Sequence, residues 1–133
     1  AQQRAQGGGV IVHLASTLGL VGAPATSVYA ATKGAVIAMT RALAVELAPQ
    51  RTRVCCVAPG VVDTDMVRAP RGPARPGEDE RAQGERQIAE LASLHPLGRV
   101  ARPEEVAEAI AYLLEADFAT GTVLVLDGGL TAV

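Results

Sequence analysis

Aromatic residues and lysine are scarce in this 133-residue chain, which has no tryptophan, one phenylalanine, two tyrosines and a single lysine. The arginines are scattered, so the chain lacks the basic stripe with interleaved aromatic side chains that is typical of nucleic-acid-binding proteins. No apolar run approaches the roughly 20 residues that a transmembrane helix needs. We therefore expect neither a nucleic acid nor a membrane among its partners.

Cysteine and histidine are also scarce, with two of each. Cys55 and Cys56 are adjacent in an apolar run, so on a strand they point to opposite faces and cannot easily bond each other. We expect both to be small buried side chains in a reducing compartment, the cytoplasm. No metal-ligand spacing appears, and His13, inside an apolar run, is expected to be a hydrogen-bonded core residue.

What the chain does have is apolar residues, at 49%, with a formal net charge of only -2. This composition predicts a single globular domain. Three short runs rich in branched residues have the pattern of buried strands: 9–15, 53–58 and 122–126. Because all three are apolar on both faces and helical patterns separate them, we expect an α/β fold with a parallel sheet covered by helices.

Helical patterns occupy residues 28–48, residues 88–94 and a segment that begins at Pro103. Thr26 or Ser27 is the expected N-cap of the first helix, which should end before Pro49. Arg102 precedes the last helix and is a poor capping residue, so the first turn of this helix should be only weakly stabilised.

Residues 68–86 are dominated by proline, glycine, arginine and glutamate, and contain too few apolar side chains to pack a core. A disordered surface insertion and a mobile lid both fit this composition, and the residues alone leave the choice open.

The single lysine, Lys33, lies four residues after Tyr29 in the first predicted helix, so both side chains share a helix face. A nearby ammonium lowers the pKa of a phenol from about 10 toward the range of a general acid/base. Lysine can also donate to several hydroxyls, which the planar arginine fork does poorly. Tyr-x-x-x-Lys is common by chance, however, and an ordinary solvated helix face is the alternative.

Two further segments follow strand ends on the edge where parallel sheets bind ligands: Ser16 and the turn 59–64. A hydroxyl, a phenol and an ammonium would then meet at one edge. Carbonyl reduction by hydride transfer needs such groups, because a donor must polarise the carbonyl and an acid must protonate the developing alkoxide.

With these residues the chain resembles the short-chain dehydrogenase/reductase family, and in particular its 3-oxoacyl-carrier-protein reductases and carbonyl reductases. The matching motifs span nearly the whole chain. They are Ser16 thirteen positions before Tyr29-x-x-x-Lys33, Pro59-Gly60-x-x-x-Thr64-x-Met66, Pro96-Leu97-Gly98-Arg99, Pro103-Glu104-Glu105-Val106-Ala107, and Thr120-Gly121 ahead of Asp127-Gly128-Gly129.

The resemblance implies a catalytic set of three residues. Tyr29 would be the general acid in reduction and the base in oxidation. Lys33 would bind the nicotinamide ribose and lower the pKa of Tyr29, while Ser16 would hydrogen-bond the substrate oxygen.

It also implies a cofactor site and a lid. Pro59, Gly60 and Val62 would line the nicotinamide, together with Tyr29 and Lys33, and Thr64 would contact the carboxamide or the pyrophosphate. The cofactor would be NADP or NAD, with NADP favoured. Residues 67–95 would cover a small ketone or an acyl-thioester substrate, and the protein would be a homotetramer or homodimer.

The family's glycine-rich nucleotide turn and its catalytic asparagine have no counterpart here. Gly7-Gly8-Gly9 precedes a strand instead of linking a strand to a helix. The chain also opens without methionine, and we expect residues 1–133 to be one partial domain, the carboxyl-terminal half of a doubly wound Rossmann-type sheet. By itself such a half should be poorly soluble, because one sheet edge and one side of the core lack partners.

A non-catalytic role is the alternative. The chain would then be a truncated oligomerisation or regulatory subunit of a reductase, with the alanine-rich helix 28–48 packing against another copy. Retention of Ser16, Tyr29 and Lys33 argues against it, because a chain freed from catalysis has no chemical reason to keep all three.

Overall fold

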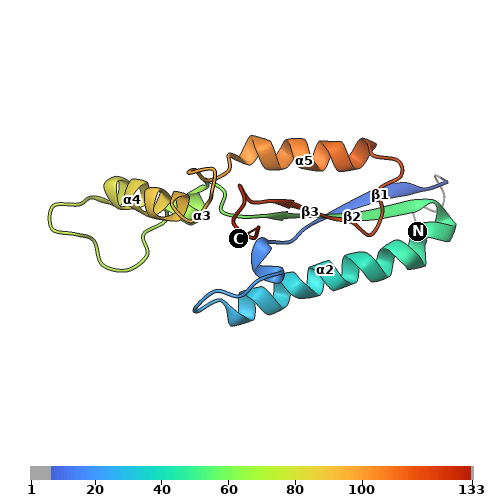
Figure 1. The fold of residues 1–133 in the computed structure, drawn as a ribbon, viewed down its shortest axis with the longest axis horizontal. Helices are drawn as coiled ribbons and strands as arrows, with labels where there is room; N and C mark the ends of the chain where they lie inside the picture. Colours follow the sequence, from blue (N-terminus) through green and yellow to red (C-terminus); the bar gives the residue numbers. More distant parts are fainter. Residues whose placement is uncertain (1–6, 133) are drawn as a thin grey trace.

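The computed structural model describes residues 7–132, which form a three-stranded parallel sheet with a long helix on each face (Figure 1). The strands are β1 (Gly9–Leu14), β2 (Thr52–Pro59) and β3 (Val123–Leu126), and β2 lies in the centre. Helix α2 (Ser27–Leu47) covers one face and α5 (Pro103–Glu115) the other. The predicted parallel α/β sheet is confirmed.

The core has two layers that meet at β2, whose side chains are almost all buried. On one side Cys55 and Val57 pack against Leu113 of α5, and on the other Cys56 packs against Ile37 of α2. The adjacent cysteines therefore point to opposite layers and are both free, as predicted. Burial raises the pKa of both thiols, which keeps them protonated and unreactive.

His13 on β1 is a hydrogen-bonded residue of the α2 layer. Its Nδ1 lies 2.8 Å from Oγ1 of Thr40, and that hydroxyl donates its own proton to the Val36 carbonyl at 2.8 Å. Nδ1 must therefore be the donor of the first contact. The prediction of a satisfied core histidine is confirmed.

The ends of α2 agree with the sequence pattern. Thr26 is the N-cap residue, although its hydroxyl donates to the Ala23 carbonyl at 2.7 Å instead of capping the helix. The helix ends at Leu47 and a 3-10 turn, Ala48–Gln50, carries Pro49.

Helix α2 also bears on the membrane prediction. By length and composition alone, Ser27–Gln50, with a mean hydropathy of 1.2, is long and apolar enough to cross a membrane. One such helix is weak evidence of a membrane span, since the stretch also contains Lys33, Arg41 and Glu46, and the expectation of no membrane partner stays a prediction. The core helix of a soluble protein passes the same test, and α2 packs along β2.

The start of α5 is better fixed than Arg102 suggested. The Glu105 carboxylate reaches back and accepts from the Arg102 backbone N–H at 2.8 Å, and it also accepts from both terminal nitrogens of Arg99 at 2.8 and 2.7 Å. Glu105 thus supplies the backbone contact that the arginine side chain cannot. Arg99, through its hydrogen bonds, lowers the pKa of Glu105 to about 2.

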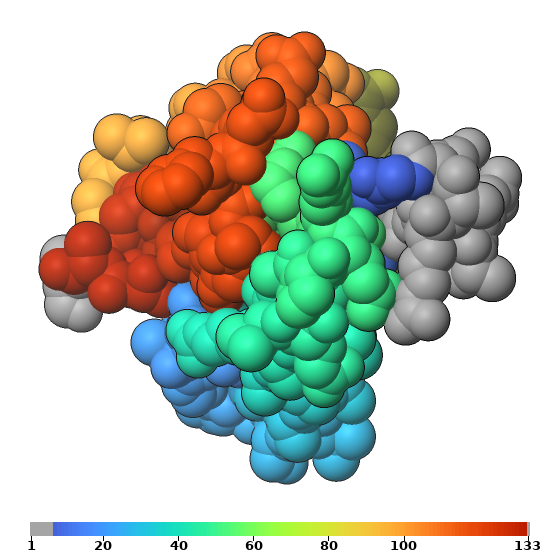
Figure 2. All heavy atoms as spheres, turned by 90° about the vertical axis from the view of Figure 1, so that its right-hand side faces the viewer, coloured from blue at the N-terminus to red at the C-terminus, as the bar shows by residue number. Residues whose placement is uncertain are grey.

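The amino-terminal end of the sheet is closed by Arg53 of β2. Its guanidinium donates to the carbonyls of Leu113 and Leu114, at 2.9 and 2.7 Å, which are among the last carbonyls of α5. Figure 2 looks onto this end, where the turn after α2, in green, lies against the segment after α5, in orange. Ligands of parallel sheets bind at the opposite, carboxyl end.

Residues 67–95 contain more structure than the sequence predicted. Helix α4 runs over Glu80–Ala92, so the prediction of a helix over 88–94 was wrong at its start. The carboxylate of Asp79 accepts from the Ala82 N–H at 2.8 Å and so caps this earlier start, and an ion pair between Arg81 and Glu85 stabilises the first turns. Together with the short helix α3 (Asp65–Arg68), α4 projects beyond the carboxyl ends of the strands (Figure 1).

Candidate active site

The carboxyl ends of the three strands lie side by side, because Leu14 pairs with Val57 and Pro59 pairs with Leu126. Ser16 follows β1 as the N-cap of the 3-10 turn η1 (Thr17–Gly19). Its Oγ accepts the Leu18 N–H at 3.2 Å, and the side chain is buried. The hydroxyl proton of Ser16 is therefore free to be donated to a ligand.

Gly19 allows the turn η1 to lie directly against the backbone of α2. A Cβ on Gly19 would lie 2.7 Å from the Lys33 carbonyl carbon and 2.9 Å from the Gly34 nitrogen, so only glycine allows this approach. The contact fixes the turn that carries Ser16 against the part of α2 that carries Lys33. Sequence reasoning missed this contact, although Gly34 inside an alanine-rich helix was a usable signal.

Tyr29 and Lys33 lie on one face of the first turns of α2, as the four-residue spacing predicted. The Lys33 Nζ is 5.7 Å from the centre of the Tyr29 ring and donates to the Leu14 carbonyl at 3.0 Å. Tyr29 is 47% exposed, and its hydroxyl makes no hydrogen bond within residues 7–132. The lysine thus joins the phenol to the end of β1.

The turn 59–64 follows β2 and is held by its neighbours in the chain. The Gly60 N–H donates to the Leu126 carbonyl at 3.0 Å, and Val62 pairs with Ala101 in an isolated bridge. The Thr64 hydroxyl donates to the Val62 carbonyl at 3.4 Å. Pro59, Gly60, Val62 and Thr64 therefore form one turn on the carboxyl edge of the sheet, at the end of the strand that pairs with β1.

The segment over residues 67–95 is joined to this turn by an ion pair. Arg68 donates from Nε and a terminal nitrogen to the two Asp63 oxygens, both at 2.6 Å. Gly84 of α4 packs directly on α3, since a Cβ there would lie 2.9 Å from the Arg68 carbonyl oxygen. The first residues of the segment are therefore fixed between the turn and α4.

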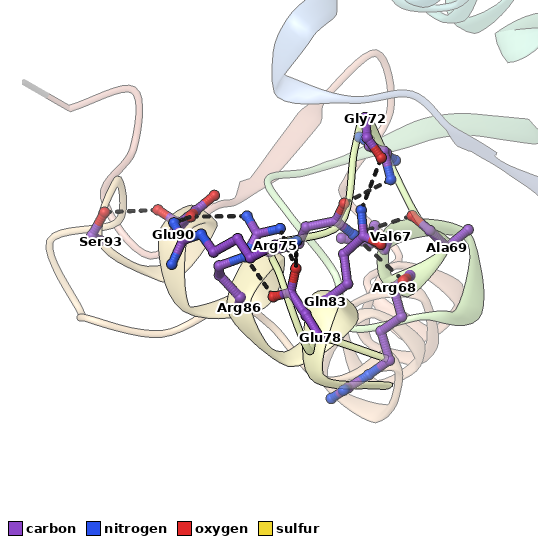
Figure 3. A network of polar contacts seen from close by, with 12 residues as sticks. Val67, Arg68, Ala69, Gly72, Arg75, Glu78, Gln83, Arg86, Glu90 and Ser93 are labelled. Atoms are coloured by element: carbon purple, nitrogen blue, oxygen red, sulfur yellow. Dashed lines mark hydrogen bonds and ion pairs between the residues drawn. The ribbon is translucent and has the colours of Figure 1, made fainter. Parts of the chain in front are cut away.

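Polar side chains take the place of an apolar core in this segment (Figure 3). The buried Gln87 accepts from the Arg71 N–H at 2.8 Å and donates to the Ala69 carbonyl at 3.1 Å, and Gln83 donates to the Gly72 carbonyl at 3.1 Å. The composition of the segment did not reveal this network. Its one signal was a pair of glutamines four residues apart.

A second tie within the segment joins Glu78 to Arg86. The arginine donates to both carboxylate oxygens, at 2.8 and 3.1 Å, and also contacts Glu90 at 3.2 Å (Figure 3). These hydrogen bonds lower the pKa of Glu78 to about 2. Residues 68–86, for which the composition left a disordered insertion and a mobile lid open, thus make side-chain contacts within the segment.

A parallel sheet with a hydroxyl, a phenol and an ammonium at its carboxyl edge has the architecture of Rossmann-type oxidoreductases. The chain belongs to the short-chain dehydrogenase/reductase family: residues 1–131 match the family model described as enoyl-(acyl carrier protein) reductase. The resemblance inferred from the motifs is confirmed.

Two characterised relatives illustrate the match. The chain is 44% identical over 131 residues to cis-4-hydroxycyclohexanecarboxylate dehydrogenase of Sinomonas cyclohexanicum, covering 97% of this chain and 47% of that protein. It is 42% identical over 125 residues to human 3-oxoacyl-[acyl-carrier-protein] reductase, covering 94% and 46%. The chain thus spans about half the length of these relatives.

Among solved structures, ElxO with NADP bound superposes with a TM-score of 0.85 at 31% identity. The match covers 99% of this chain and 50% of that one. The predicted relation to part of a Rossmann-type sheet is therefore confirmed, and the family's cofactors are NAD and NADP, as expected.

Proposed function

We propose that this chain supplies the catalytic residues of an NAD(P)-dependent oxidoreductase that interconverts a carbonyl and a secondary alcohol. The observation that carries the proposal is the position of Lys33, whose ammonium lies 5.7 Å from the Tyr29 ring and bonds the last residue of β1 at 3.0 Å. Ser16 follows that strand end two residues later.

The residues fit the nicotinamide ribose. An ammonium has three N–H groups and Lys33 uses one of them on the Leu14 carbonyl, which leaves two for neighbouring hydroxyls. The Tyr29 hydroxyl is also unbonded within the described residues. Both side chains are therefore donors without a full set of partners at the edge where such ligands bind.

In the reduction, the bound cofactor supplies the hydride to the carbonyl carbon. Tyr29 gives its phenolic proton to the carbonyl oxygen, which becomes the hydroxyl of the product, and takes that proton back in the oxidation. Ser16 donates to the same oxygen and stabilises the charge that develops on it. Lys33 stabilises the phenolate and orients the ribose.

The remaining residues complete the site. Pro59, Gly60 and Val62 line the nicotinamide, and Thr64 contacts its carboxamide or the pyrophosphate. Residues 67–95 act as the substrate lid. Two features support this role: the Arg68–Asp63 ion pair attaches the segment to the turn 59–64, and polar contacts within the segment hold it together. The substrate is a small ketone or a 3-oxoacyl thioester, NADP is the favoured cofactor, and the assembly is a homodimer or homotetramer.

A second role has one observation in its favour. Helix α2 exposes apolar side chains such as Val45, at 77% exposure, which could pack against another chain. The chain would then be a truncated, non-catalytic oligomerisation or regulatory subunit of a reductase. This role explains the exposed face of α2 but not the retained Ser16, Tyr29 and Lys33.

The test uses the protein as its natural source makes it, with whatever chain accompanies residues 1–133. Reductase and dehydrogenase rates are measured with NADPH, NADH, NADP and NAD on small ketones, 3-oxoacyl thioesters and the matching alcohols. Tyr29→Phe should lower kcat by roughly a hundredfold or more, as expected for a general acid/base, and leave cofactor affinity within about twofold. Turnover by the variant at the wild-type rate would refute the mechanism, and inactivity of the wild type would favour the subunit.

A further inference from the structure

We propose that His95 is a positioning residue that holds the turn 59–64 in the shape that receives the nicotinamide, an inference that rests on the proposed function. His95 lies between the end of α4 and Pro96 and is only 4% exposed. It is neither part of the catalytic set nor close to it in sequence.

Its two ring nitrogens join the lid to the turn. Nδ1 lies 2.9 Å from the Leu91 carbonyl of α4, and a carbonyl can only accept, so Nδ1 carries the proton. Nε2 is then an acceptor and receives the Val61 backbone N–H at 3.4 Å. One neutral tautomer satisfies both contacts, whereas an imidazolium would set a donor against the Val61 N–H.

The ring also sets the packing of the turn. A Cβ on Gly60 would lie 3.1 Å from His95 Nε2 and 3.1 Å from Asp127 Cα, so Gly60 is enclosed between the imidazole and the end of β3. Leu97 and Gly98 hold the histidine backbone in place: the Leu97 N–H donates to the Gly128 carbonyl at 3.1 Å and the Gly98 N–H donates to the His95 carbonyl at 2.7 Å.

His95 and Val61 line a small pocket, and among the described residues the charged groups that line it with them are Asp127, just after β3, and Arg99 and Glu105 around the start of α5. Asp127 is committed to the turn that follows β3, since its oxygens accept from Gly129 and Thr131. Arg99 and Glu105 are committed to each other. Asp127, Arg99 and Glu105 are thus each paired with another group. The His95 ring contacts both α4, through Leu91, and the turn 59–64, through Val61.

Val61 depends on this acceptor. Its carbonyl is already bonded by the Ala101 N–H at 2.9 Å, and Asp63 donates its N–H to the Ala101 carbonyl at 2.8 Å. The Val61 N–H between them has His95 as its partner. Without the His95 acceptor, the partly buried Val61 N–H would be unsatisfied. Rotation of its peptide toward solvent would then lower the free energy of the turn.

Two variants separate the two nitrogens. His95→Asn keeps a polar atom near the Leu91 carbonyl but does not reach Val61, and His95→Gln keeps an acceptor that can reach Val61. In the natural protein we expect His95→Asn to weaken NADP binding about tenfold, because an unsatisfied buried donor costs a free energy of that order. The NADP affinity of His95→Gln should remain within roughly threefold of wild type.

The matched ligand is 2′-phospho-ADP-ribose, which is NADP without the nicotinamide. Its affinity should stay within about twofold in both variants, because Val61, whose N–H His95 accepts, lies between Gly60 and Val62, the residues proposed to line the nicotinamide. A merely structural role for His95 would weaken both ligands together. Equal losses for NADP and 2′-phospho-ADP-ribose, or no loss for NADP in His95→Asn, would overturn the proposal.

Amide hydrogen exchange at Val61 gives a readout that does not depend on the proposed function. His95→Asn should accelerate this exchange at least about tenfold, and His95→Gln should restore it. If the wild type binds neither nucleotide, the proposed function fails, and the exchange rate alone then decides. An unchanged rate in His95→Asn would show that the histidine does not hold the turn, and a restored rate in His95→Gln would support it.

Discussion

The Lys33 ammonium donates to the Leu14 carbonyl at 3.0 Å, which ties the first turns of α2 to the last residue of β1. A guanidinium is a planar fork whose donors lie in one plane, so it cannot point one donor at this carbonyl and the others at ribose hydroxyls in the same way. The proposed role of Lys33, the single lysine of the chain, therefore requires a lysine and not an arginine.

Replacing Lys33 by arginine should therefore impair catalysis although the charge is kept. We expect Lys33→Arg to lower kcat/KM of the natural protein by roughly a hundredfold, the contribution of a well-tuned general acid/base. Steady-state rates with saturating NADPH measure it. Arg41→Lys, an exchange of the same two residue types at an exposed position of α2, is the control and should have wild-type rates.

Gly19 should tolerate no side chain. In Gly19→Ala the new Cβ would meet the Lys33 and Gly34 backbone at 2.7 to 2.9 Å, so η1 or α2 must shift. Overpacking of this kind typically costs about 1–3 kcal/mol. Urea unfolding measures the loss, and Gly22→Ala is the control because a Cβ there meets nothing within 4 Å. Equal midpoints for the two variants would contradict the close contact.

The carboxylates of Glu78 and Glu105 should make stability fall in acid. Their arginine partners lower both pKa values from 4.5 to about 2 in the folded protein. A carboxylate whose pKa is lower in the folded than in the unfolded state stabilises the fold at any pH above the unfolded pKa. This stability is lost as pH falls from about 4.5 to about 2. Thermal melts across that range measure it.

Glutamine variants test the source of this acid sensitivity. Glu105→Gln should lower the melting temperature at neutral pH and flatten part of the pH curve, and adding Glu78→Gln should flatten it further. A double variant with the wild-type slope would show that other carboxylates carry the effect.

Local chemistry was sufficient to predict the sheet and the helix face that Tyr29 and Lys33 share. Apolar runs between helical patterns predict buried parallel strands, and the spacing of Tyr29 and Lys33 predicts a shared face in any helix. The ends of the three strands and of α2 lie within one residue of the expected positions, which is the margin by which assignments usually differ, whereas α4 starts eight residues before the predicted position.

The structure of residues 67–95, the proposed lid, and their attachment to the rest of the chain could not be predicted in the same way. The order of residues 67–95 comes from Gln83 and Gln87, which bond backbone carbonyls rather than other side chains, and such contacts leave no periodic pattern in a sequence. His95 presents the same difficulty, because its partners Leu91 and Val61 are backbone groups, one of them distant in the chain. The motif predicted the turn 59–64, but the contacts that hold this turn, from His95 to Val61 and from Arg68 to Asp63, were not predicted.

The adjacent thiols of β2 give each core layer its own chemical reporter. Cys55 lies in the layer that α5 covers and Cys56 in the layer that α2 covers, both fully buried. A thiol reagent can therefore modify either one only after the corresponding helix has lifted from the strand. Pulse labelling followed by peptide mass analysis would measure the rate at which each cysteine becomes accessible. It would thereby report the detachment of α5 and of α2 separately, at two consecutive residues of one strand.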